Sequence, residues 1–358
     1  DTTWSLSNSP YTVTGSILIP DGVTLTIEAG VTVKFNSGLY IKNEGVITAV
    51  GTSSNKITFE SNSVSPAKSD WSGIRIRPTG GSAIDGSQNY SSGSQFKHVI
   101  IKHADIGLYV YDTGLHVSYT EFDTNNYGVE IRKTDGVVID NSTFTENTAG
   151  IWSEYEDYSS TDYVQAISNT FIKNSTFSAN NYGIDLIMNQ RDFINLNITT
   201  NIFTENNIGI DFGGGGYGPR VHSVLISENI VYNSSSYGVN LNRVYGLGTG
   251  TSLDYPLEFT KNIVLNNAGG SLMFEYSPSV KFKIHKNILI SNTADVNNIA
   301  SIGSPSTSNH LFNNNTIISK GKNVYFGGSS SYHANNITFT NNLFGNSSNN
   351  DIIDIKYG

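Results

Sequence analysis

A repeated pattern decides the fold, and its clearest copies read "IDNSTFTENTAGIW" (139–152), "IKNSTFSANNYGID" (172–185), "TTNIFTENNIGID" (199–211) and "SENIVYNSSSYGVNL" (227–241). Each copy holds a short alternating strand, an Asn, a large apolar residue, further polar residues, and then Gly with Ile or Val. The glycine of this pattern recurs at Gly107, Gly128, Gly150, Gly183, Gly209 and Gly238, with a smallest step of 21 residues. A fixed smallest step with insertions of variable length indicates stacked structural units with loops at one corner.

The strands within each unit alternate with period 2 over a few residues, and no amphipathic pattern of helical length occurs. Three short strands per unit, separated by tight turns, are typical of a parallel β-helix. The sequence therefore predicts an all-β fold in which each repeat is one rung of such a helix.

A column of asparagines accompanies the repeat. Asn tolerates the left-handed conformation of a sharp corner, and its amides can hydrogen-bond to an identical residue on the next rung. We therefore predict an Asn ladder made of Asn141, Asn174, Asn201, Asn229, Asn262, Asn287, Asn315 and Asn342.

The two ends of the chain differ from its middle. Residues 1–70 have longer strands and a Pro-Asp-Gly turn at 20–22, so we expect an N-terminal cap with the first rungs there, and a continuous β-helix body over 71–358. The last residues, "DIIDIKYG", are still strand-like. An open end of this kind predicts further C-terminal domains in the natural chain.

Composition excludes several classes of function. The formal net charge is −9, so we expect no nucleic-acid partner, because such partners require a basic surface. There is no cysteine, hence no disulfide and no thiol chemistry. No run approaches 18 apolar residues, so we expect no membrane insertion.

The N-terminal stretches "PYTVTGSILIPDGVTLTIEAGVTVKF" (10–35) and "ITFESNSVSPAKSDWSGIRI" (57–76), together with the rungs, resemble secreted right-handed parallel β-helix proteins of the pectate-lyase-like type. The Asn- and Tyr-rich, cysteine-free composition is also similar to surface proteins of methanogenic archaea, among them the disaggregatase family that degrades a chondroitin-like matrix. The resemblance implies a secreted or cell-surface protein that acts on polysaccharide. The catalytic motifs of polygalacturonases, such as Gly-His-Gly and Asn-Thr-Asp, are absent.

The strand after the repeated glycine presents alternate residues outward. Stacking turns these positions into columns, and in the resembling families this face forms the glycan groove. The first column reads Arg75, Tyr109, Glu130, Trp152, Asp185, Asp211 and Asn240. The second reads Arg77, Tyr111, Arg132, Glu154, Ile187, Gly213 and Asn242.

Acidic residues gather on neighbouring rungs of these columns. Like charges in register repel, so a sheet does not gain stability from them. Their proximity should raise the pKa of one acid while its neighbour stays ionised, the arrangement that glycoside hydrolysis needs. We expect Asp185 and Asp211 to be the acid and nucleophile pair, with Glu154 and Glu130 as supporting or alternative carboxylates.

Aromatic and basic residues near the acids are candidates for substrate binding, because flat rings pack on sugar C–H faces and cations bind acidic sugars. They are Trp152, Tyr109, Tyr111, Arg132, Tyr217, Arg220, His222 and Arg243. The run Gly213 to Gly216 removes side chains beside Asp211 and could let a ligand approach the backbone; a plain flexible loop explains it equally well.

We therefore expect a secreted polysaccharide-degrading enzyme, most simply a glycoside hydrolase with a polysaccharide substrate and no cofactor. Two alternatives stay open: a non-catalytic cell-surface adhesion module, and a lyase on uronate-containing glycans, for which bases and cations are available. The acids could instead hold Ca²⁺, although no Asp-x-Asp-x-Asp loop supports this.

Overall fold

The computed structural model describes residues 1–153, 166–187, 192–213, 220–241, 244–246, 257–275, 282–292, 299–302, 310–320, 324–327, 337–346 and 353–355. These residues form strands and two short 3-10 turns, with no α-helix among them. Contacts group the chain into two compact units, one made of Asp1–Glu154 with Ile167–Asn181, the other with described residues from Tyr182 onward.

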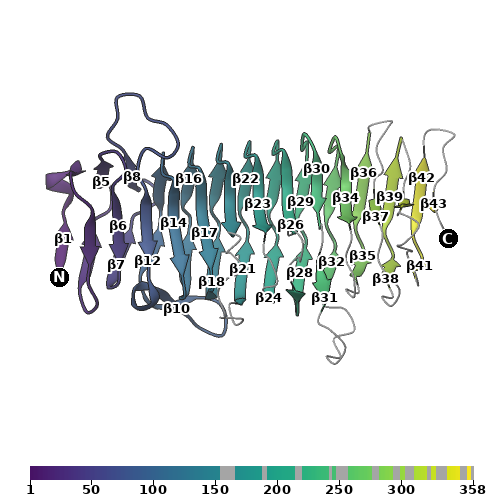
Figure 1. The fold of residues 1–358 in the computed structure, drawn as a ribbon, viewed down its shortest axis with the longest axis horizontal. Coiled ribbons are helices and arrows are strands. Elements are labelled where there is room, and N and C mark those ends of the chain that lie inside the picture. Colours follow the sequence, from purple (N-terminus) through teal and green to yellow (C-terminus); the bar gives the residue numbers. More distant parts are fainter. Residues whose placement is uncertain are drawn as a thin grey trace, which may run out of the picture. The chain divides into compact units, whose positions relative to one another are not determined.

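Three parallel sheets, here named A, B and C, build the first unit (Figure 1). Sheet A contains β1 (Thr2–Trp4), β4 (Thr24–Ile27), β7 (Val46–Val50), β12 (Gln95–Lys97), β15 (Leu115–Ser118), β18 (Asp135–Asp140) and β21 (Ile167–Lys173). Sheet B contains β2 (Tyr11–Val13), β5 (Thr32–Phe35), β8 (Ile57–Ser61), β13 (Val99–Lys102), β16 (Glu121–Asp123), β19 (Thr143–Thr145) and β22 (Thr176–Ser178). Sheet C contains β3 (Ile17–Ile19), β6 (Tyr40–Asn43), β9 (Gly73–Ile76), β14 (Ile106–Tyr111), β17 (Tyr127–Arg132) and β20 (Ala149–Ser153).

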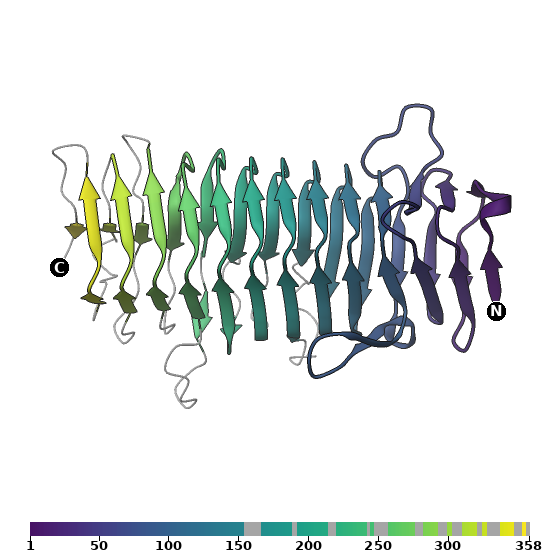
Figure 2. The ribbon, with the colours of Figure 1, turned by 180° about the vertical axis from the view of Figure 1, so that it is seen from behind.

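The second unit repeats this arrangement (Figure 2). Its sheet A contains β24 (Asp192–Thr199), β27 (Arg220–Val221), β28 (Val224–Ser227), β31 (Tyr245–Gly246), β32 (Leu257–Thr260), β35 (Phe282–His285), β38 (His310–Asn313) and β41 (Ile337–Thr340). Its sheet B contains β25 (Ile202–Thr204), β29 (Ile230–Tyr232), β33 (Ile263–Leu265), β36 (Ile288–Ser291), β39 (Thr316–Ser319) and β42 (Leu343–Asn346). Its sheet C contains β23 (Tyr182–Ile187), β26 (Ile208–Gly213), β30 (Tyr237–Asn240), β34 (Gly270–Glu275), β37 (Ile299–Ile302), β40 (Val324–Gly327) and β43 (Ile353–Ile355).

Most rungs contribute one strand to each sheet, with β27 and β31 as short additional strands of sheet A in the second unit, and successive rungs pair in parallel register. In the first unit, for example, β15, β16 and β17 pair with β18, β19 and β20. The predicted all-β parallel β-helix with three short strands per rung is therefore confirmed. Residues 1–61 already follow this pattern, because β1 pairs with β4 and β2 pairs with β5.

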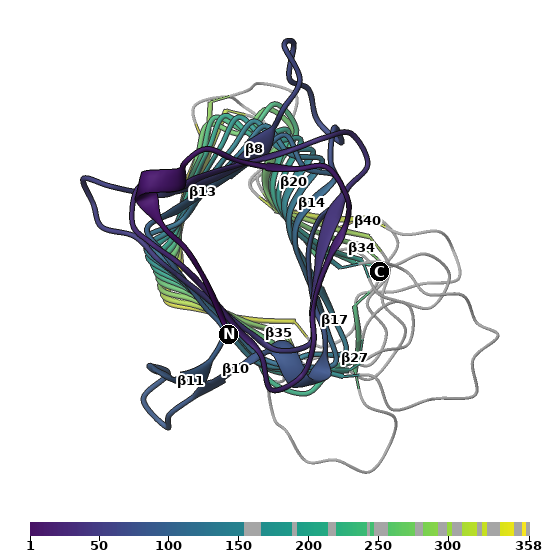
Figure 3. The same cartoon turned by 90° about the vertical axis from the view of Figure 1, so that its left-hand side faces the viewer.

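The interior of each unit is filled by the inward residues of the three sheets, which surround it when viewed along the stack (Figure 3). In sheet B of the first unit, the rings of Phe122, Phe144 and Phe177 stack in sequence, with centroids 4.7 Å and 4.6 Å apart. Identical residues on successive rungs thus bury apolar area and keep the rungs in register. A hairpin of β10 (Ser82–Ile84) and β11 (Tyr90–Gly93) projects from this unit (Figure 3).

The repeated glycine is required by the stacking of rungs. A Cβ on Gly107 would lie 2.5 Å from the carbonyl oxygen of Gly128. One on Gly183 would lie 2.4 Å from the carbonyl oxygen of Gly209. No real Cβ makes so short a contact, and the fold therefore needs glycine at this position of each rung.

The Asn ladder is confirmed for six of its eight members, from Asn201 to Asn342, all in the second unit. At each step the backbone N–H and side-chain amide donate to the next Asn; from Asn262 to Asn287 these distances are 2.9 Å and 3.1 Å. The further steps follow the same geometry. All of these side chains except the partly exposed Asn342 are buried, so the ladder satisfies amides that have no access to water.

The prediction was wrong for Asn141 and Asn174, which are not ladder members. Both have positive φ angles, 48° and 51°, and their side-chain amides donate to Asp140. The ladder position is the following residue, because the left-handed corner residue turns the chain so that its successor points inward. In the first unit that successor is Ser142 or Ser175, and the backbone N–H of Ser142 donates to Ser175 Oγ at 3.1 Å.

The first unit has an Asn ladder at the other corner, between sheets B and C. The backbone N–H of Asn125 donates to Asn147 Oδ1 at 2.9 Å, and that of Asn147 donates to Asn180 Oδ1 at 2.8 Å. Among the described residues, no helix is long and apolar enough to cross a lipid bilayer.

Candidate functional site: outward columns of sheet C

The predicted outward column exists as two in-register segments, one in each unit. In the first unit Arg75 pairs with Tyr109, Tyr109 with Glu130, and Glu130 with Trp152. In the second unit Asp185 pairs with Asp211, Asp211 with Asn240, and Asn240 with Met273. Alternation along each strand therefore does bring these sequence-distant residues side by side.

Two carboxyl groups stand side by side in the second unit. Asp185 on β23 and Asp211 on β26 are direct partners on hydrogen-bonded strands. Asp185 is 5% exposed, and its Oδ1 is buried and accepts no hydrogen bond from the residues that the structure describes. Two carboxyl groups on paired strand positions, shielded from water, cannot both be ionised without a large electrostatic cost.

Burial and mutual repulsion set the protonation of this pair. Desolvation, reinforced by the charge of Asp211, raises the pKa of Asp185 to about 8. Desolvation also raises the pKa of Asp211, to about 6, although hydrogen bonds to its carboxylate oppose the shift. At neutral pH the pair therefore holds one proton, on Asp185, beside an ionised Asp211.

One side chain hydrogen-bonds to this pair, and another interacts with it electrostatically. Asn240, the next residue of the column, donates its Nδ2 to Asp211 Oδ1 at 3.0 Å and so favours the ionised form of Asp211. Tyr182 lies on the same strand as Asp185, and its pKa is raised by burial and by the charges of both aspartates. A protonated phenol is thus held beside the carboxyl pair.

The acid of the first unit has a different environment. Glu130 is completely buried, and Arg132 Nε donates to its Oε1. The Arg132 side chain is 20% exposed, whereas that of Glu130 is fully buried. Glu130 therefore has its charge balanced by a neighbour two residues along the same strand.

Arginines and tyrosines alternate on the outer face of the first unit. The guanidinium carbon of Arg132 lies 5.2 Å from the Tyr109 ring centroid. Arg77 lies 5.2 Å from the centroid of Tyr109 and 5.6 Å from that of Tyr111. These cation–π contacts hold flat rings and guanidinium groups in one surface, a combination that suits anionic sugar units.

Trp152 lies on β20 and is partly exposed. Its ring stacks on Tyr127 of β17, with centroids 3.9 Å apart and planes 10° from parallel. The stack buries one face of the indole and fixes the ring against the sheet.

The other predicted site residues are placed only in part. His222 follows β27, and its Nε2 lies 3.1 Å from Asp192 Oδ2 on β24. Arg220 begins β27, but its side chain lies outside the described residues, as do Glu154, Tyr217, Arg243 and Gly214–Gly216 entirely. Gly213 ends β26 and pairs with Ile187.

Three residues of these surfaces were not predicted as site residues: Arg77, Tyr182 and Asn240. Two of them, Asn240 and Arg77, could have been predicted from the sequence, because they are members of the outward columns. Tyr182 precedes the repeated glycine, and only the folded strand shows that its ring lies near the carboxyl pair. Within the described part of the chain, no group of three or more His, Asp or Glu could hold a metal ion.

Comparison with known proteins supports the fold. No curated protein matches the sequence. The A-module of mannuronan C-5 epimerase AlgE6 from Azotobacter vinelandii is similar in structure, with a TM-score of 0.61, 12% identity, and coverage of 94% of this chain and 88% of that chain. The catalytic domain of Agl-KA is similar with a TM-score of 0.50 and 18% identity, over 94% of this chain and 62% of that one.

The sequence itself matches one family, described as the pectate-lyase-like β-helix domain, over residues 1–98. This stretch contains the N-terminal motifs on which the resemblance rested. The chain is therefore a right-handed parallel β-helix whose first 98 residues match the pectate-lyase-like β-helix domain.

Proposed function

We propose that this protein degrades polysaccharides and that it is a glycoside hydrolase whose reacting groups are Asp185 and Asp211. The observation that carries the proposal is the in-register pair of buried carboxyl groups, one protonated and one ionised at neutral pH. The pair lies on the outward side of sheet C, where Asp211 is partly exposed. The structurally similar mannuronan epimerase has a polysaccharide as its substrate.

The roles of the two acids follow from their environments. Asp185 keeps its proton and is the general acid that protonates the glycosidic oxygen as the bond to the anomeric carbon breaks. Asp211, ionised and held by Asn240, attacks or stabilises that carbon from the other side. Neighbouring strands lie ~4.8 Å apart, near the ~5 Å carboxyl spacing of retaining enzymes. We therefore propose retention of anomeric configuration.

The Arg–Tyr surface of the first unit supports an acidic sugar as part of the substrate. Arg77 and Arg132 are held by tyrosine rings, so little conformational entropy would be lost when they bind a uronate carboxylate. The same location on sheet C is where the resembling families bind glycans. An exported or cell-surface location fits a polysaccharide substrate.

A lyase is the second candidate, and one observation favours it. His222 Nε2 lies 3.1 Å from the Asp192 carboxylate, which places an imidazole beside an acid as a candidate base for abstracting a proton next to a uronate carboxyl group. A lyase would produce an unsaturated sugar that absorbs near 235 nm, whereas a hydrolase would produce reducing ends without this absorbance.

The test is to incubate the protein with alginate, polygalacturonate and chondroitin sulfate and to measure both signals. We expect reducing ends without new absorbance, and we expect Asp185→Asn and Asp211→Asn each to lower kcat by about 10³-fold, the usual range for an acid or base catalyst. Glu228→Gln, an exposed acid paired with Lys261, is the control that should keep full activity.

Three results would change the assignment. Activity that survives in both Asp variants would show that the pair is not catalytic. Unsaturated products that disappear in His222→Ala would establish the lyase. Binding without cleavage of any polymer would leave an adhesion module as the function.

A further inference from the structure

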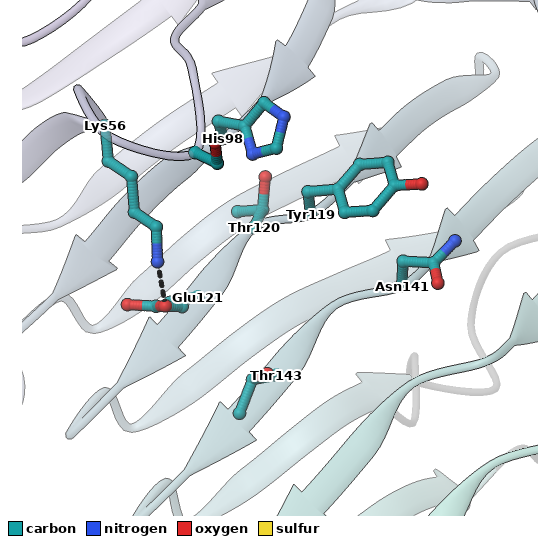
Figure 4. A pocket seen from close by; sticks show the side chains of 8 residues that line it. Lys56, His98, Tyr119, Thr120, Glu121, Asn141 and Thr143 are labelled. Atoms are coloured by element: carbon teal, nitrogen blue, oxygen red, sulfur yellow. Dashed lines mark hydrogen bonds and ion pairs between the residues drawn. The ribbon is translucent and has the colours of Figure 1, made fainter.

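A second surface feature lies outside sheet C, at the corner between sheets A and B of the first unit. It is a pocket of about 250 Å³ between the turns that follow β12, β15 and β18 (Figure 4). Lys56, His98, Tyr119, Glu121 and Asn141 line it. Sites for drug-sized ligands measure ~300–1,000 Å³, so this pocket has room for one sugar-sized ring.

The aromatic residues of this pocket occupy backbone positions that do not favour them. His98 and Tyr119 have φ angles of 52° and 51°, in the left-handed region. The next corner residue of the same column is Asn141, with φ 48°, and Asn is the side chain that tolerates this conformation best. A bulky ring there costs about 1 kcal/mol, and two rungs in succession accept this cost.

The two rings stack on each other, and the exposed part of this stack is the aromatic surface of the pocket. Their centroids lie 5.0 Å apart, with planes 25° from parallel, and Tyr119 is 46% exposed. Burial and the charges of Lys97 and Lys56 lower the pKa of His98, so its imidazole is neutral at pH 7. The surface is therefore apolar and uncharged on its faces, with polar atoms at its edges.

Polar side chains line the rest of the pocket. Lys56 Nζ and Glu121 Oε1 form an ion pair that holds both side chains toward the pocket (Figure 4). Thr143 and Asn141 add a hydroxyl and an amide. An exposed aromatic stack beside donors and acceptors matches a pyranose, which has C–H faces and hydroxyl groups around its edge.

We propose that this corner pocket is a second glycan-binding site that holds one sugar unit of the polysaccharide on the Tyr119 and His98 rings. The proposal rests on the proposed function for its ligand class. Binding at two places on one chain converts the second contact into an intramolecular one, and so retains a long polymer more strongly than a short fragment.

Tyr119→Asn is the informative variant, because Asn suits the left-handed corner and the fold should tolerate it. Binding is measured by affinity electrophoresis in alginate, chondroitin sulfate and dextran, in the Asp185→Asn background so that no polymer is cut. We expect Tyr119→Asn to weaken binding of at least one polymer about tenfold, which corresponds to about 1.4 kcal/mol. Tyr232→Asn, an outward tyrosine on β29, should leave binding unchanged.

The outcomes separate this site from the proposed function. If the wild-type protein cuts a polymer and Tyr119→Asn binds it as before, the corner site is wrong and the hydrolase stands. If Tyr119→Asn loses affinity while no polymer is cut by the wild type, the corner site stands and the hydrolase is wrong. If the protein binds none of the three polymers, the corner site is overturned.

Discussion

The same outward slot of sheet C holds an acid in both units, and the two acids have opposite environments. Glu130 in the first unit is buried under Arg132, which balances its charge. Asp185 in the second unit is buried beside Asp211, another acid. The residue two positions along the strand makes the difference: it is Arg132 after Glu130, but Ile187 after Asp185 and Gly213 after Asp211.

This comparison separates an acid that is part of the framework from acids that are available for chemistry. A buried carboxylate with a cation beside it has a partner that balances its charge. Two neighbouring buried carboxyl groups repel each other when both are ionised, and a scaffold gains no stability from this arrangement. Three predictions test the distinction.

The largest effect is expected when the ion pair of the first unit is broken. Arg132→Met leaves Glu130 buried without its cation, and we expect the free energy of unfolding to fall by about 3 kcal/mol. Urea unfolding, followed by the fluorescence of the three tryptophans Trp4, Trp71 and Trp152, measures this change. The double variant Arg132→Met/Glu130→Gln should recover much of the loss. A loss below about 1 kcal/mol would mean that the pair behaves like an exposed one.

The second prediction concerns the pH dependence of stability. Because the pKa of Asp185 is raised to about 8, the folded protein holds a proton that the unfolded chain has already released above about pH 4. Stability is therefore lost as the pH rises toward about 8, at about 1.4 kcal/mol per pH unit for this proton. Asp185→Asn should remove the contribution of this proton to the pH dependence of stability. This variant should be more stable than the wild type above pH 8.

Urea unfolding at a series of pH values measures how the free energy of unfolding of the wild type and of Asp185→Asn depends on pH. Glu130→Gln is the matched control, since it neutralises the acid in the other unit and should not stabilise the protein at high pH. Equal slopes in the wild type and in Asp185→Asn would contradict the raised pKa.

The smallest effect concerns the hydrogen bond from Asn240. If the pair is catalytic, the rate should follow a bell-shaped pH profile with limbs near the pKa values of about 6 and about 8. Asn240→Leu removes a donor that favours ionised Asp211, so the acid limb should move to higher pH. The shift should stay under about one pH unit, because one hydrogen bond contributes about 1 kcal/mol. Met273→Leu, the next residue of the column, should leave the limb in place.

Local periodicity predicted much of this fold. The period-2 strands, the repeated glycine and the Asn column together specify a rung, and the structure confirms the rung, the glycine contacts and the Asn201–Asn342 ladder. The residues that share a column of sheet C were also predictable, because the constant part of each rung places equivalent residues of successive repeats side by side. Asn141 and Asn174 were wrongly assigned to the ladder because the alignment of the repeats compared residue types and not backbone conformations. Only the φ angles show that they precede the ladder position.

The sequence by itself determined which residues share a column, since this depends on spacing alone. Tertiary structure decided what each column residue does, since burial and neighbouring charges come from the packed rungs. In the sequence, Glu130 and Asp185 are both acidic residues at equivalent positions of the repeat. They differ in the neighbour of the buried carboxyl group, which is a guanidinium for Glu130 and a second carboxyl group for Asp185. The same holds for Tyr119, whose exposed ring and left-handed corner appear only in the folded chain.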